Sequence, residues 1–134
     1  MFKKVLAIAL FIAISSSPAY ALFGRKQPVY NIVDAPIVTS SGKTPTSNQI
    51  EQAFTNAAHY KGWSVKPDGK GALIASIHVR RHYAEIAMTH TDSTYSITYR
   101  NSKVLLYDGK KIHRNYNKWV KLLDRKFREN LNKL

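Results

Sequence analysis

The sequence predicts an α+β fold: an antiparallel meander of about four strands with two helices packed on one face, which together form a two-layer sandwich. Apolar and polar residues alternate along four short segments between Trp63 and Arg100, and this is the period of half-buried strands. One segment on each side of this region repeats apolar residues at spacings of three and four, as helices that cover a sheet do. Short turn signals between the strands favour antiparallel pairing.

The first residues have the pattern of a cleavable secretory signal peptide. Lys3-Lys4 precedes the apolar run Val5–Ile14, and Ala19-Tyr20-Ala21 matches the small-x-small cleavage rule. As a helix, this run of ten residues spans about 15 Å, which is too short to cross a membrane. We therefore expect residues 1–21 to be removed by cleavage after Ala21. The product is expected in the periplasm, without a transmembrane segment and, because no Cys follows, without a lipid anchor.

Residues 22–45 are expected to form a flexible lead with one short edge strand, and residues 46–134 a single α+β domain. Val29–Val38 is apolar and β-branched, and Pro36 restricts it to the edge of a sheet. Thr46 and Gln49 have the spacing of a capping box, and Gly62 fits the left-handed position after a helix. The predicted helix carries one apolar stripe, made of Ile50, Ala53, Phe54, Ala57 and Tyr60.

Turns are expected at Arg81-His82 and at residues 90–93, and Asp108-Gly109 indicates a hairpin between Val104–Tyr107 and Lys110–Ile112. A long helix is expected from about Arg114. Its apolar stripe consists of Tyr116, Trp119, Val120, Leu123, Phe127, Leu131 and Leu134. Its other side carries Lys118, Lys121, Arg125 and Arg128. We interpret this basic stripe as the solvated back of a core helix; the alternative is a surface that lies on an anionic membrane.

Charge and composition limit the class of partner. Without the signal peptide the chain has 113 residues, with 19 Lys and Arg against 8 Asp and Glu, a net charge of +11. This charge favours polyanions of the envelope or acidic proteins without choosing among them. The chain has no Cys, so its core must be held by packing alone. No cofactor and no specific nucleic acid are expected, since no reading motif is present, and the oligomeric state is left open.

The histidines and acids give little support for chemistry. His78 and His82 stand about 13 Å apart along a strand, too far to share one ion, so no metal site is expected. A small envelope enzyme that uses His82, Glu85 or His113 is the alternative function. The sequence has no nucleophile elbow and no phosphate loop, so we assign no catalytic residue.

Two regions are candidates for binding a ligand or partner. The first is the polar face of the sheet, with His78, Arg80, Glu85 and the adjacent His82, where Arg80 and Glu85 are expected to pair across strands. The second is the junction Tyr107–Trp119, which is dense in polar and aromatic residues. The alternatives are a solvated sheet face and a core helix anchored by Tyr116 and Trp119 and capped by Asn115 or Asn117. The candidates in the junction are Tyr107, His113, Asn115, Tyr116 and Asn117.

Short motifs between about Ile50 and Leu131 carry a family resemblance. They include Gly62-Trp63, Arg80-Arg81-His82, the run LLYDG that ends at Gly109, and most specifically the IHxNYNxWV motif of residues 112–120. The chain resembles a family of small uncharacterised proteobacterial periplasmic proteins and lipoproteins. The resemblance implies an envelope location and a single domain, and it supplies no catalytic residue. The chain lacks the Cys of the lipoprotein members.

These observations together predict an exported periplasmic binding or interaction module. It is expected to contact an anionic envelope component or an envelope protein through the polar sheet face and the Tyr107–Trp119 junction. A further alternative is charge-driven adhesion to lipopolysaccharide or DNA, which predicts binding that weakens steeply with salt.

Overall fold

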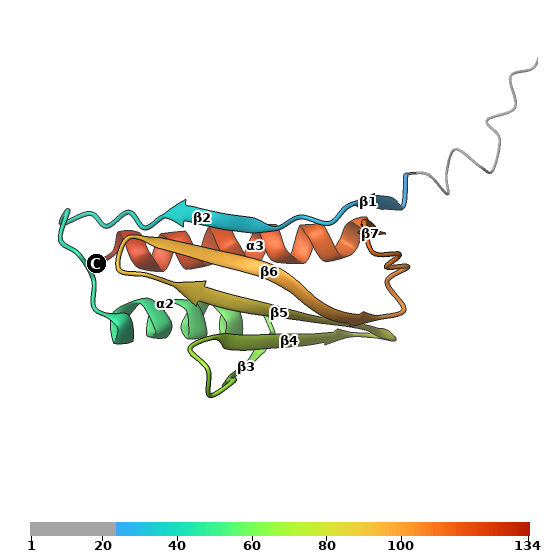
Figure 1. Ribbon diagram of the computed structural model, residues 1–134, viewed down its shortest axis with the longest axis horizontal. Coiled ribbons are helices and arrows are strands. Elements are labelled where there is room, and N and C mark those ends of the chain that lie inside the picture. The colour runs from blue at the N-terminus through green and yellow to red at the C-terminus, as the bar shows by residue number, and fades with distance from the viewer. Residues whose placement is uncertain (1–23) are drawn as a thin grey trace, which may run out of the picture.

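The protein has two layers, a five-stranded antiparallel sheet and two helices that cover one of its faces (Figure 1). The structure is a computed structural model, and it describes residues 24–134; the expected signal peptide and the first residues of the expected lead lie outside the described residues. In spatial order the strands are β2 (Ile32–Pro36), β6 (Thr94–Lys103), β5 (His82–His90), β4 (Leu73–Val79) and β3 (Ser64–Pro67). The helices are α2 (Ser47–Tyr60) and α3 (Arg114–Asn132). The predicted α+β class is confirmed.

A second, two-stranded sheet joins the N-terminal segment to the start of α3. Strand β1 (Lys26–Pro28) pairs antiparallel with β7 (Lys111–His113). Within the expected flexible lead, Lys26–Pro28 is therefore a strand that forms backbone pairs with β7. The expected hairpin between Val104–Tyr107 and Lys110–Ile112 is wrong, because Val104 and Leu106 adopt φ values of 61° and 58°, which interrupt an extended strand.

Helix α2 begins and ends as its sequence predicts. The Thr46 side chain accepts a hydrogen bond from the Gln49 amide, and the Gln49 side chain accepts one from the Thr46 amide, which completes the capping box. At the other end Gly62 has a φ of 89°, and the Trp63 amide donates to the Ala58 carbonyl. This turn sends the chain directly from the helix into β3.

The turns of the sheet differ slightly from the prediction. The β4–β5 turn lies at Arg80-Arg81, with Arg80 at a φ of 57°, so His82 belongs to β5 and not to the turn as expected. The β5–β6 turn lies at residues 91–93, after His90. Strand β2 occupies an edge, as Pro36 predicts, and pairs with β6 across a register shift between Ile32 and Ala35.

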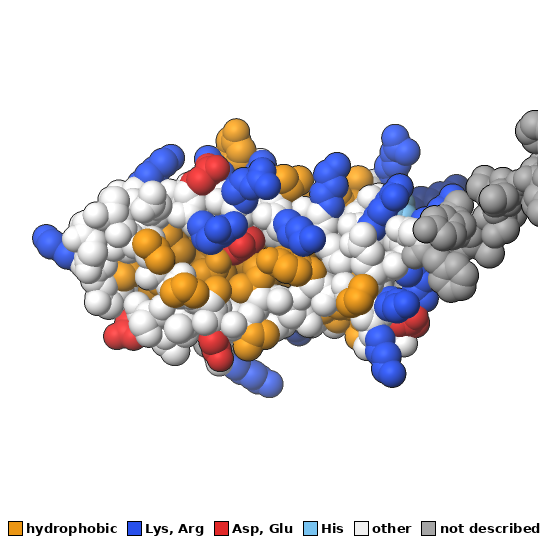
Figure 2. Space-filling model, turned by 90° about the horizontal axis from the view of Figure 1, so that it is seen from above, with side chains coloured by type: hydrophobic (Ala, Val, Ile, Leu, Met, Phe, Trp, Pro, Cys, Tyr) orange, Lys and Arg blue, Asp and Glu red, His pale blue; other side chains and the backbone are white. Residues whose placement is uncertain are grey.

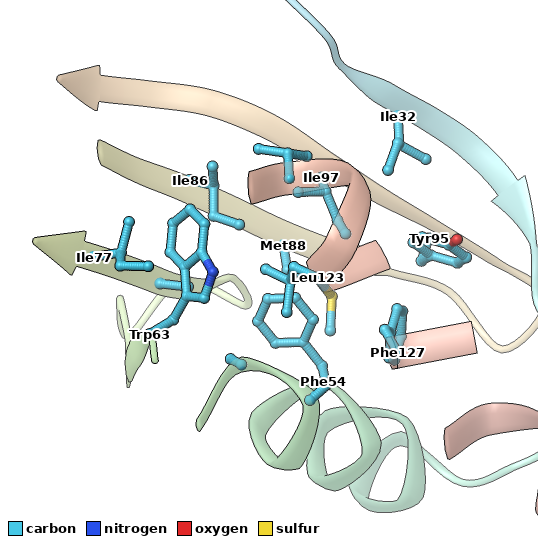
Figure 3. Close-up of a cluster of buried hydrophobic side chains, with 14 of the residues drawn as sticks. Ile32, Phe54, Trp63, Ile77, Ile86, Met88, Tyr95, Ile97, Leu123 and Phe127 are labelled. Atoms are coloured by element: carbon cyan, nitrogen blue, oxygen red, sulfur yellow. The ribbon is translucent and has the colours of Figure 1, made fainter. Parts of the chain in front are cut away.

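The core lies between the helices and the inner face of the sheet. Figure 3 shows Trp63 next to Ile77 and Ile86, with Phe54 and Phe127 contributed by the helices. The Phe127 ring meets Phe54 edge to face at 5.4 Å and Tyr95 at 4.8 Å. On the inner side of α3 the fully buried apolar residues are Tyr116, Val120, Leu123, Phe127 and Leu131.

A hydrogen-bonded polar network is also buried in this layer. The Tyr95 hydroxyl donates to the Asp124 carboxylate, whose other oxygen lies 3.1 Å from Nε of Arg128. Burial and the adjacent carboxylate raise the pKa of Tyr95 far above its usual range. This network ties the start of β6 to α3. Among residues 24–134, no helix is both long and apolar enough to cross a membrane.

Candidate functional site

The outer face of the sheet, the first predicted surface, is paired within itself. Glu85 accepts a hydrogen bond of 2.7 Å from the Tyr83 hydroxyl and lies 3.1 Å from Nε of Arg100. The His78 ring stacks obliquely on Tyr83, with centroids 4.6 Å apart. The expected Arg80–Glu85 pair is wrong, because Arg80 lies in the turn and Arg100 sits at a bulge opposite Glu85. The Tyr83–Glu85 hydrogen bond raises the pKa of Tyr83.

The residues of the alternative acid–base site do not meet. His82 and His113 lie on the helix side of the sheet, with ring centroids 6.1 Å apart, and the His82 ring is 6.2 Å from that of Trp119. Glu85 is three residues beyond His82 on one strand and so projects from the opposite face. The Glu85 carboxylate therefore cannot pair with either histidine.

His113 is the N-cap of α3, a role that the sequence suggested for Asn115 or Asn117. Its Nδ1 accepts a hydrogen bond of 3.1 Å from the Asn115 amide. This bond requires an unprotonated Nδ1. Burial lowers the pKa of His113, and the neighbouring His82, Arg114 and Arg25 lower it further.

Tyr107 and Tyr116 belong to an aromatic cluster around Tyr99. The Tyr107 ring stacks on Tyr99 with centroids 4.1 Å apart and remains 42% exposed. Tyr116 meets Tyr99 at 5.7 Å and is fully buried, as expected of a core anchor. Its hydroxyl has no hydrogen-bond partner among the described residues, and burial raises the pKa of Tyr116 far above its usual range.

Asn117 fixes the N-terminal segment to α3. Its Oδ1 accepts a hydrogen bond of 2.9 Å from the Tyr30 amide, and its Nδ2 donates to the Pro28 carbonyl at 2.9 Å and to Gln27 Oε1 at 3.3 Å. The side chain is 4% exposed, so these bonds satisfy a buried amide. They place the end of β1 beside the first turns of α3.

A groove of about 530 Å³ follows from this placement, between β1 and the outer side of α3. We call it the α3 groove. Four cations line it at positions i, i+4, i+7 and i+11 of the helix, so they form one stripe. No Asp or Glu of residues 24–134 lines the groove. Its lining residues are Gln27, Arg114, Asn115, Asn117, Lys118, Lys121, Leu122 and Arg125.

The four cations of the groove are not neutralised by the protein. Within residues 24–134, Arg114, Lys118, Lys121 and Arg125 form no ion pair. By contrast Arg128, the fifth cation of the stripe, is bound to Asp124. The Lys121 ammonium lies 5.0 Å from the centre of the Tyr30 ring.

Sequence reasoning found part of this site. It identified Lys118, Lys121 and Arg125 as a stripe but treated them as a solvated back, and it missed Arg114 and Gln27. The helical spacing from Arg114 onward could have extended the stripe by one residue. Gln27 had no local signal, because its position depends on β1 pairing with a strand far along the chain.

Other functional signals are sparse. No group of three or more His, Cys, Asp or Glu side chains in the described part of the chain could hold a metal ion. Comparisons with protein-family models, curated proteins and solved structures gave no match. The candidate site therefore depends on the geometry and charge of the α3 groove.

Proposed function

We propose that this protein is an exported binding module of the bacterial envelope that holds an anionic envelope component in the α3 groove. The observation that carries the proposal is the set of four cations in one groove with no acid among the lining residues. Export rests on the signal-peptide pattern of residues 1–21 and on the resemblance to small periplasmic proteins.

The shape of the stripe favours an extended ligand with several negative charges. Arg114 and Arg125 are eleven residues apart, which is about 16 Å along a helix. A single phosphate or carboxylate cannot reach all four cations over this length. Asn115 and Gln27 add amide groups that can donate hydrogen bonds to ligand oxygens.

The outer face of the sheet is a weaker candidate for this function. Its Glu85 carboxylate is already bound to Tyr83 and Arg100. A ligand there would have to displace these bonds, whereas cations of the α3 groove have no protein anion to exchange. The proposed binding surface therefore lies on α3 and not on the outer face of the sheet. Asn115 and Asn117 of the predicted junction line it.

The test is a titration of the protein with inorganic polyphosphate at low salt. The variant Lys118→Gln/Lys121→Gln/Arg125→Gln should bind about tenfold or more weakly than the wild type. The matched control Lys43→Gln/Lys66→Gln/Lys70→Gln removes the same charge from exposed positions away from the groove. The control should lose about twofold or less, because only the general field of the protein changes. Equal losses in the two variants would refute a specific groove and leave non-specific adhesion.

A further inference from the structure

The α3 groove continues into a second groove of different chemistry. This C-terminal groove, of about 410 Å³, lies between the segment after β2 and the last turns of α3. Arg125 lines both grooves, so they adjoin. The residues that line the C-terminal groove are Pro36, Val38, Arg125, Arg128, Glu129, Leu131 and Asn132.

The C-terminal groove offers an apolar floor with charges around it. Pro36 and Val38 supply the exposed apolar side chains, with Val38 62% exposed, whereas Leu131 lines the groove but is buried. Glu129, which lines this groove, has its carboxylate 3.5 Å from the Lys126 ammonium, so its charge is offset. Figure 2 shows one face of the molecule, where apolar side chains form a strip with Lys and Arg along one of its long sides and an acidic side chain beside it.

We infer that the anionic component is a phosphorylated lipid, an inference that rests on the proposed function. The phosphate groups bind the cations of the α3 groove, and an acyl chain lies along Val38 and Pro36 in the C-terminal groove. A soluble polyanion would use only the α3 groove and would leave the exposed Val38 in water. An amphiphile with anionic and apolar parts matches both grooves and their junction at Arg125.

This arrangement does not require the core to open. The apolar stripe of α3 that covers the sheet stays buried, since Val120, Leu123 and Phe127 are fully buried. The apolar contact comes instead from Pro36 at the end of β2 and from Val38 just after it. The exposed valine and the unpaired cations therefore face the lipid while the two layers stay packed.

The first test compares two probes, phosphatidylcholine vesicles that contain cardiolipin, a lipid with two phosphates, and soluble inorganic polyphosphate. The variant Val38→Asn should bind the vesicles about fivefold more weakly, because a partly buried valine contact is lost, and should bind polyphosphate as the wild type does. The control Val104→Asn alters a valine of similar exposure, 61%, in the loop after β6 and should change neither affinity.

The second test reports the position of Val38 directly. The chain contains no Cys, so Val38→Cys can carry a single environment-sensitive fluorophore. Its emission should shift to the blue on addition of the anionic vesicles and not of polyphosphate, and the same label at Val104→Cys should not shift.

The two proposals fail in different ways. The lipid assignment alone would be overturned if the wild-type protein bound polyphosphate but not the anionic vesicles. It would also be overturned if Val38→Asn bound the vesicles normally, or lost affinity for both probes equally. Polyphosphate binding that does not depend on Lys118, Lys121 and Arg125 would overturn the proposed function itself.

Discussion

The two sides of α3 differ in how their side chains are partnered. On the inner side the side chains have partners: Phe127 packs on Phe54 and Tyr95, and Asp124 binds the Tyr95 hydroxyl. On the outer side Lys118 and Arg125 line a groove without an ion-pair partner among the described residues. The inner side therefore accounts for stability. The outer side concentrates like charges, which costs stability unless an external anion is bound.

The largest loss of stability is expected when an aromatic side chain is removed from the inner side of α3. Phe127→Ala should lower the free energy of unfolding by about 3–5 kcal/mol, because the ring is fully buried between the two layers. Urea unfolding followed by circular dichroism measures this effect. A loss below about 1 kcal/mol would mean that the core does not depend on α3 as described.

The bond between α3 and the N-terminal segment is the next largest contribution. Asn117→Ala removes the acceptor of the Tyr30 amide and the donor to the Pro28 carbonyl, so we expect a loss of about 2–3 kcal/mol. Hydrogen exchange should show faster exchange of the Tyr30 amide. The matched control Asn56→Ala removes an exposed amide from α2, whose only side-chain bond is to Gln52, and should cost about 0.5 kcal/mol or less. Equal exchange of Tyr30 in wild type and Asn117→Ala would contradict this role.

The first turn of α3 should respond to pH. The pKa of His113 is lowered in the folded state, so below about pH 6.5 the unfolded chain binds more protons and the free energy of unfolding falls. His113→Asp keeps a cap acceptor that stays ionised, and should remove part of the loss of stability between pH 7 and pH 5.

Chemical unfolding at several pH values measures this difference. The control His78→Gln changes an exposed histidine of β4 and should keep the wild-type pH dependence. An unchanged pH dependence in His113→Asp would show that the N-cap histidine is not the group that titrates.

The outer side should contribute least to stability. The variant Lys118→Gln/Lys121→Gln/Arg125→Gln should change the free energy of unfolding by about 0.5 kcal/mol or less, with relief of repulsion offsetting lost packing of the side-chain stems. Thermal unfolding without ligand measures this. A loss of several kcal/mol would mean that these cations hold the fold together and are not reserved for a ligand.

The sequence predicts what depends on local pattern. The capping box at Thr46 and Gln49, the edge position given by Pro36, and the buried stripe around Val120 and Phe127 all follow from short-range chemistry or periodicity, and the structure confirms them. The hairpin after Val104 failed for a related reason. An Asp-Gly signal cannot reveal that Leu106 turns left-handed and that β7 finds a different partner.

The candidate site was harder to predict because it depends on tertiary placement. A row of cations on a helix has the same pattern whether it faces bulk water or lines a groove. The groove exists because Asn117 binds Pro28 and Tyr30, almost ninety residues away in the chain. Likewise Arg100, and not Arg80, meets Glu85 because of a bulge opposite that residue in β6.

The most direct measurement is the salt dependence of polyphosphate binding by the wild type, the groove variant Lys118→Gln/Lys121→Gln/Arg125→Gln and the control variant Lys43→Gln/Lys66→Gln/Lys70→Gln. The slope of log affinity against log salt concentration should be smaller in magnitude by about two to three for the groove variant. Each cation that meets a ligand anion contributes about one to this slope. The control variant should keep the wild-type slope. Equal slopes for all three proteins, or equal reductions in both variants, would contradict an anion site in the α3 groove.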